Sequence, residues 1–133
     1  MGAWGLGTFE NDDALDWVYE LEASTGSGVL NASLAAVDGA DYLEAPEACA
    51  ALAAAEVVAA LIGTPSQDLP EEVTGWLAAN QQQPDAELIT MAHRAVSRIK
   101  SSSELQELWE ETDEYAAWQH AMDELSLRLT ASR

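Results

Sequence analysis

The chain has 133 residues, and its hydrophobic fraction of 48% is ordinary for one globular domain with a substantial core. It carries 24 Asp and Glu against 5 Lys and Arg, a formal net charge of −19, and no Lys or Arg precedes Arg94. Such a chain repels nucleic acids and anionic lipids, because affinity for them comes mainly from basic side chains that neutralise phosphates. Composition therefore argues against nucleic-acid binding and favours a basic partner, although high charge also keeps an alanine-rich protein soluble.

The sequence predicts a cytoplasmic protein without a membrane anchor. No apolar run reaches the roughly 18–20 residues that span a bilayer, and the N-terminus lacks the basic and apolar regions of a secretory signal. Leu6 occupies the position where myristoylation requires Ser or Thr. Cys49 is the single cysteine, so no internal disulfide can form, as is typical of a reducing compartment.

Helical periodicity runs through most of the chain. Alternating β-branched or aromatic runs are missing, and Ala, Leu and Glu dominate the periodic segments. We therefore expect an all-α fold, a single domain over residues 1–133 with six or seven helices. The predicted helices cover residues 12–23, 28–37, 46–62, 70–81 and 85–100, followed by one long helix over 103–130 or two helices joined near Asp113.

The first nine residues, MGAWGLGTF, combine three glycines (Gly2, Gly5 and Gly7) with two large aromatic residues, Trp4 and Phe9. A dinucleotide fingerprint needs a preceding strand and a different glycine spacing, so no nucleotide site is expected. Glycine lets the backbone lie close to neighbouring helices, and large aromatic side chains anchor it in apolar pockets. The pattern predicts an N-terminal arm packed on the helical bundle.

The first predicted helix has an acidic face. Asn11 is its expected N-cap, and acidic residues in the first turn suit the partial positive charge of a helix N-terminus. Val18, Tyr19 and Leu21 are expected on its apolar stripe. We expect a partner to contact the acids near this face and an exposed aromatic beside them, a set formed by Asp12, Asp13, Asp16, Trp17 and Glu20.

No metal site or cofactor is predicted. Carboxylates three or four residues apart on a helix could offer oxygen ligands to a hard cation, but nothing resembles an EF-hand loop, and such ladders are usually solvated. His120 lies four residues before Glu124, a spacing that metal pairs share, yet no third ligand is evident. Structural hydrogen bonding is expected for His120 and for His93.

Glu56 is the one polar side chain in the central part of the helix predicted over 46–62. We expect it to mark the solvent-facing side, since an unpaired Glu is seldom buried. If that side were packed instead, Glu56 would be a desolvated carboxylate of the kind that acid–base catalysis uses. The two alternatives place the same residue on a wet surface or in a candidate site.

The basic residues gather in one stretch, HRAVSRIK, which contains Arg94, Arg98 and Lys100. We expect them to pair with acidic residues of this chain, although the same stretch is where an acidic ligand would dock. The chain also has 5 Trp, which is many for its length. Most are expected to fill the core, and one or two to be exposed as contacts for a partner.

The opening MGAWGLGTFENDDALDW resembles the start of a bacterial protein family, the domain of unknown function 4259 family. Members begin with Met-Gly-x-Trp-Gly-x-Gly-x-Phe, followed by Asp or Glu, Asn and Asp. The matching positions are Met1, Gly2, Trp4, Gly5, Gly7, Phe9, Glu10, Asn11, Asp12 and Asp13. The resemblance implies that residues 2–17 act as a unit, and it implies no activity, substrate or catalytic set.

Three classes of function stay open. The prediction is a small, non-enzymatic protein that captures a basic partner, as immunity proteins of similar size and charge capture basic toxin nucleases. One alternative is an enzyme or small-ligand protein with a site between helices, in which Glu56, His93 or His120 acts as the acid–base group. The other is a structural protein without a ligand, including a homo-oligomer.

Overall fold

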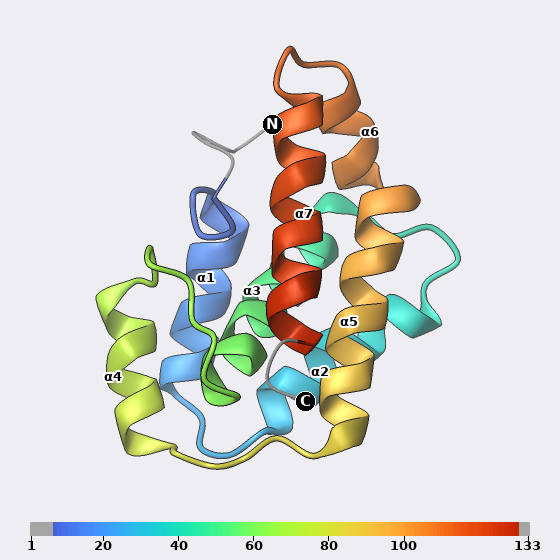
Figure 1. Cartoon of the computed structure of the whole chain (residues 1–133). Helices are drawn as coiled ribbons and strands as arrows, with labels where there is room; N and C mark the ends of the chain where they lie inside the picture. Colours follow the sequence, from blue (N-terminus) through green and yellow to red (C-terminus); the bar gives the residue numbers. More distant parts are fainter. Residues whose placement is uncertain (1–6, 131–133) are drawn as a thin grey trace.

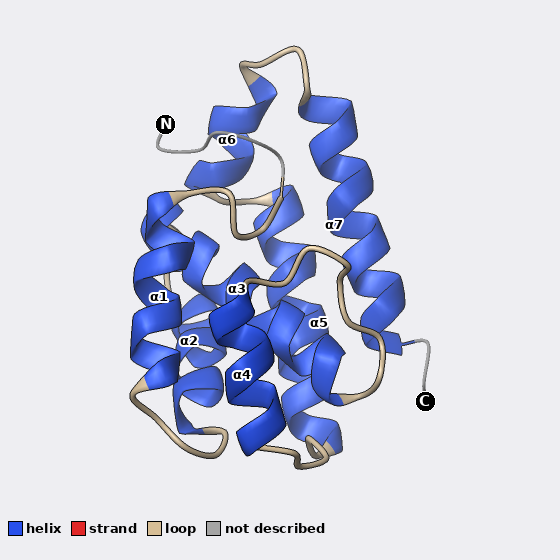
Figure 2. Ribbon diagram, turned by 90° about the vertical axis from the view of Figure 1, so that its left-hand side faces the viewer, coloured by secondary structure: helices blue, strands red, loops and turns tan. Residues whose placement is uncertain are grey.

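The fold is all-helical in a computed structural model that describes residues 7–130 (Figures 1 and 2). The predicted all-α class is confirmed for this part of the chain, with seven helices that end within a few residues of the expected limits. In chain order they are α1 (Asp12–Glu22), α2 (Gly28–Gly39), α3 (Ala45–Leu61), α4 (Glu71–Ala79), α5 (Ala86–Ser101), α6 (Glu104–Glu110) and α7 (Tyr115–Thr130). None of these helices is long and apolar enough to cross a membrane.

The alternative of two helices over 103–130 is the correct one. Helix α6 starts at the N-cap Ser103, whose side chain accepts a hydrogen bond from the Gln106 backbone N–H. Its end is fixed by Thr112, whose N–H and hydroxyl both donate to the Trp109 carbonyl. Competition of this kind between a hydroxyl and the helical hydrogen-bond pattern is typical of Thr near helix ends. Leu108, which a continuous helix would bury beside Tyr115, is only half-buried.

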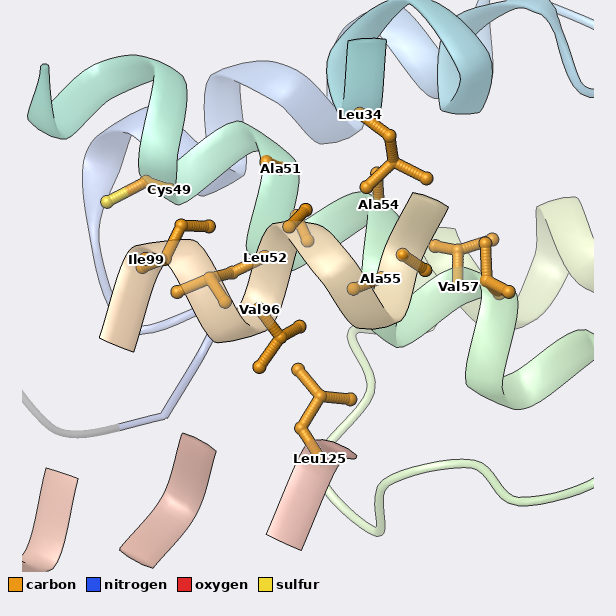
Figure 3. Close-up of a cluster of buried hydrophobic side chains, with 14 of the residues drawn as sticks. Leu34, Cys49, Ala51, Leu52, Ala54, Ala55, Val57, Val96, Ile99 and Leu125 are labelled. Atoms are coloured by element: carbon orange, nitrogen blue, oxygen red, sulfur yellow. The ribbon is translucent and has the colours of Figure 1, made fainter. Parts of the chain in front are cut away.

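Helix α3 is the centre of the molecule and contacts each of the other six helices described (Figure 1). Its many alanines let neighbouring helices approach closely, and nearly all side chains from Ala48 to Ala59 are buried. Figure 3 shows Leu34 of α2, Val96 and Ile99 of α5 and Leu125 of α7 gathered around this helix. The predicted central helix is therefore confirmed, and it fixes where the surrounding helices lie.

The end of α3 is a Schellman motif built on Gly63. Gly63 has φ +99°, a conformation that side chains other than glycine rarely adopt. The Thr64 N–H donates to the Ala59 carbonyl at 2.9 Å, and the Gly63 N–H donates to the Ala60 carbonyl at 3.1 Å. This turn places Thr64 beside α7, where its hydroxyl donates to the Arg128 carbonyl at 2.8 Å.

Buried aromatic side chains join the last two helices. Trp118 of α7 stacks on Trp109 of α6 and on Tyr115, with ring centroids 6.5 Å and 6.2 Å away. Trp17 and Trp76 are buried as well, which confirms the expectation that most tryptophans fill the core. Within the described residues, the exposed large hydrophobic side chains are instead Tyr19, Tyr42 and Leu127.

Candidate functional site

The segment that leads into α1 fixes the direction of its acidic face. The Asn11 side-chain oxygen accepts a hydrogen bond from the Ala14 N–H at 2.8 Å, which confirms the predicted N-cap. The Asn11 amide also donates to the Thr8 carbonyl at 3.2 Å, and Phe9 is half-buried against the core. The described part of the arm is therefore packed on the bundle. The other expected arm residues, Gly2, Trp4 and Gly5, lie outside the described residues.

An acidic groove of about 350 Å³ lies between α1, α2 and the start of α3. Its rim carries four exposed carboxylates, because α1 presents residues three and four apart on one side and α3 contributes a fourth from across the groove. Small side chains of α2 form the opposite wall. The lining residues are Asp13, Asp16, Trp17, Glu20, Ala32, Ser33, Ala36, Pro46, Glu47 and Ala50. The structure thus brings together four of the five residues predicted to contact a partner, and leaves Asp12 exposed outside the groove.

Trp17 has a different role from the one predicted. It is only 3% exposed, and its indole N–H donates to the Ser33 hydroxyl at 2.8 Å. The expectation of an exposed aromatic at this position is wrong, because Trp17 shares the buried face of α1 with Ala14 and Leu21, three and four residues away. Trp17 is the apolar floor of the groove. The exposed aromatic residue of α1 is Tyr19, which is 67% exposed. The expectation that Tyr19 belongs to the apolar stripe of α1 is therefore wrong.

The basic side chains of the described chain are all engaged away from the groove. Arg94 forms an ion pair with Asp38 at 2.9 Å, and Lys100 one with Asp123 at 2.6 Å. These two residues pair with acids of this chain as expected, whereas Arg98 donates to two backbone carbonyl groups near the end of α2 instead. In the described residues, no ion pair neutralises a carboxylate of the groove rim.

The thiol of Cys49 is buried one turn into α3, close to the groove. Burial, together with the negative charge of Asp13, raises the pKa of Cys49 to about 12. With this raised pKa, the Cys49 thiol is neutral at physiological pH. Because the thiolate is the nucleophilic form, Cys49 is not suited to covalent chemistry.

Glu56 does not mark a solvent-facing side of α3. That expectation is wrong, since the Glu56 side chain is only 7% exposed. The reason is a partner that lies 72 residues later in the chain. Arg128 of α7 donates to both carboxylate oxygens of Glu56, with Nη1 at 2.9 Å from Oε1 and Nη2 at 3.2 Å from Oε2. Bidentate pairing of this kind satisfies a buried carboxylate.

Further hydrogen bonds complete the surroundings of this ion pair. The Thr8 hydroxyl donates to Glu56 Oε2 at 2.9 Å, so a residue of the N-terminal arm also contacts the carboxylate. Arg128 Nε donates to Glu124 at 2.7 Å, and Nη1 donates to the Thr64 carbonyl at 3.2 Å. Burial lowers the pKa of Arg128, but the hydrogen bonds to Glu56 and Glu124 and the charges of these two carboxylates outweigh it, so the pKa is raised. The cluster joins the arm, α3, the loop after α3 and α7.

A pocket of about 520 Å³ lies beside the Glu56–Arg128 pair. It is polar and lined from the arm by residues 7–10, from the loop before α4 by Ser66, Asp68 and Pro70, and from α7 by Ala121, Glu124 and Arg128. The catalytic alternative requires two of the residues Glu56, His93 and His120 to converge in one pocket. Both candidate histidines are absent from this lining, as His93 lies half-buried on α5 and His120 is exposed on α7.

The chemistry of the two sites differs. The Glu56 carboxylate is already occupied by a guanidinium and a hydroxyl, an arrangement that suits a structural link between segments. The carboxylates of the acidic groove have no such partners and face solvent over an apolar floor. Among the residues described, no group of three or more His, Cys, Asp or Glu side chains could hold a metal ion. The acidic groove is therefore the stronger candidate for binding.

Comparison with known proteins identifies one matching protein family. The model of a protein family described as a domain of unknown function (DUF4259) matches residues 2–121. The match includes the arm, the acidic groove and Glu56, and it ends before Arg128. No curated protein and no solved structure matches the chain.

Proposed function

The chain belongs to the DUF4259 family, a domain of unknown function, and we propose that it is a small cytoplasmic protein whose acidic groove captures a basic segment of a partner protein. The proposed role is binding without catalysis. The observation that carries it is the groove itself, in which four carboxylates face solvent without an ion pair among the described residues, above the apolar floor formed by Trp17.

Charge explains how the partner would be recruited. With a net charge of −19, the protein attracts cationic surfaces over a distance and speeds their encounter. Lys and Arg side chains of the partner would then pair with the rim acids Asp13, Asp16, Glu20 and Glu47, while an apolar side chain covers Trp17. The same field repels nucleic acids, because phosphates carry the charge of the rim.

Salt dependence tests this proposal. We expect a lysine-rich peptide to bind at low ionic strength, and its Kd to rise at least tenfold between about 50 mM and about 500 mM NaCl, because salt screens exposed charges. Isothermal titration calorimetry measures the Kd. The control peptide has glutamine at every lysine position and is expected not to bind. Absence of binding at low salt, or a Kd that salt leaves unchanged, would count against the proposal.

A further inference from the structure

Residues 7–10 form a tight turn that crosses α3 before α1 begins. The Glu10 N–H donates to the Gly7 carbonyl at 3.0 Å, and the Gly7 N–H donates back to Glu10 Oε1 at 3.0 Å. A Cβ atom at Gly7 would lie only 2.5 Å from that carboxylate oxygen, so any larger residue here would displace the exposed Glu10 side chain from this hydrogen bond. We call residues 7–10 the strap. Its two internal hydrogen bonds define the turn in the packed structure.

Among the described residues, three contacts hold the strap on the bundle. The Asn11 amide at the start of α1 donates to the Thr8 carbonyl at 3.2 Å. The Thr8 hydroxyl donates to Glu56 Oε2 at 2.9 Å, and Phe9 is half-buried against the core. Glu56 is a fixed acceptor, because Arg128 binds both of its oxygens. A hydrogen bond to a charged acceptor contributes more to stability than a neutral one. The Thr8 hydroxyl therefore makes a specific contact that holds the strap against α3.

The strap also closes one side of the pocket beside Glu56, since Gly7, Thr8, Phe9 and Glu10 all line it. The other walls belong to α7 and to the loop before α4, and these do not depend on the strap. Segments held by few contacts open at a lower free energy than the helices of a core. Opening of the strap would widen this pocket and expose Glu56 while the helices stay folded.

We propose that residues 7–10 are a strap over the Glu56 pocket, which Thr8 fastens to the buried Glu56–Arg128 ion pair and which opens without unfolding of the helical bundle. This inference is independent of the acidic groove. It concerns the pocket beside Glu56, which shares no lining residue with the groove, and it assigns to Thr8 a role as a positioning residue. The strap is a conformational device that couples the start of the chain to its last helix.

Limited proteolysis of the full chain tests the strap, with chymotrypsin cleavage after Phe9 followed by mass spectrometry. Cleavage in a folded protein tracks the population of the open state. We expect Thr8→Val, which keeps the shape and loses the donor, to be cut about tenfold faster at this bond than the wild type. Thr8→Ser keeps the hydroxyl and is expected to be cut at the wild-type rate. Each rate is normalised to that of a short peptide with the same substitution.

A double-mutant cycle shows whether Thr8 acts through Glu56. The pair Glu56→Leu and Arg128→Met removes the acceptor, so adding Thr8→Val to it is expected to have no further effect on cleavage after Phe9. Three results would overturn the proposal. They are a wild-type rate for Thr8→Val, an undiminished effect of Thr8→Val without the ion pair, and an equal rise in cleavage within α3 and α7, which would indicate unfolding of the whole molecule.

Discussion

Replacing Arg128 with methionine is expected to lower the free energy of unfolding by about 3–5 kcal/mol, the cost of leaving a buried charge without its partner. The Glu56 side chain is only 7% exposed and that of Arg128 only 16%, so the carboxylate would lose its partner while it stays largely shielded from water. The substitution also removes the hydrogen bonds from Arg128 to Glu124 and to the Thr64 carbonyl. Urea unfolding followed by circular dichroism measures the change.

A matched exposed pair provides the control. Arg94 also forms a bidentate contact, with Asp38, but its side chain is 57% exposed. Arg94→Met is therefore expected to cost less than about 1 kcal/mol. Combining Arg128→Met with Glu56→Leu should recover much of the lost stability, because a buried ion pair can be replaced by apolar side chains of similar volume. Equal small effects for Arg128→Met and Arg94→Met would contradict the account of Glu56 as a buried, paired carboxylate.

Neutralising the rim of the acidic groove is expected to weaken binding of a lysine-rich peptide by about tenfold at low salt. The variant carries Asp13→Asn, Asp16→Asn and Glu20→Gln, which keep the side-chain shapes and remove three charges. An exposed ion pair contributes roughly 0.2–1 kcal/mol, so three of them together approach the 1.4 kcal/mol that corresponds to a factor of ten in Kd. Calorimetric titration of wild type and variant gives the ratio.

The control variant distinguishes the effect of the groove carboxylates on binding from the effect of the net charge of the protein. It carries Glu111→Gln, Asp113→Asn and Glu114→Gln, which remove the same number of charges from the turn between α6 and α7. These exposed residues line no part of the groove. Their loss is expected to change the Kd by no more than about twofold, because salt screens charges that make no direct contact. Equal losses in both variants would mean that the peptide responds to net charge alone.

Local sequence patterns were sufficient to predict the helices. Periodicity, helix-favouring composition and the positions of Pro46, Gly63 and Asn11 mark where helices begin and end, and these signals act over a few residues. The central position of α3 was also predictable, because a helix that is apolar on nearly all sides must be buried. The break between α6 and α7 was left open, since it depends on a single Thr hydroxyl at Thr112.

The candidate sites depend on contacts between distant residues, which spacing in the sequence cannot reveal. Glu56 is buried because Arg128 and Thr8 reach it from opposite ends of the chain. Sequence reasoning considered the carboxylate alone and therefore placed it in solvent. No local signal identified Thr8, and the only clue to Arg128 is that it is the one Lys or Arg residue in the last helix.

The acids of α1 were predicted, but the groove they line was not. Glu47 faces them from α3, and Ala32 and Ala36 of α2 complete the wall, so three helices must pack before the groove exists. The error at Trp17 has a similar origin. Both Trp17 and Tyr19 are large amphipathic aromatics, and only the packing of α1 decides that the Trp17 N–H meets Ser33 while Tyr19 faces solvent.

Amide chemical-shift mapping of a lysine-rich peptide on isotope-labelled protein tests the central claim most directly, because it locates the bound peptide. The account predicts that the perturbed signals cluster at the groove, on the α1 residues Asp13 to Glu20, on Ser33, on Glu47 and on the indole N–H of Trp17. Perturbations spread evenly over every acidic surface, or confined to the pocket beside Glu56, would contradict the assignment of the acidic groove as the partner site.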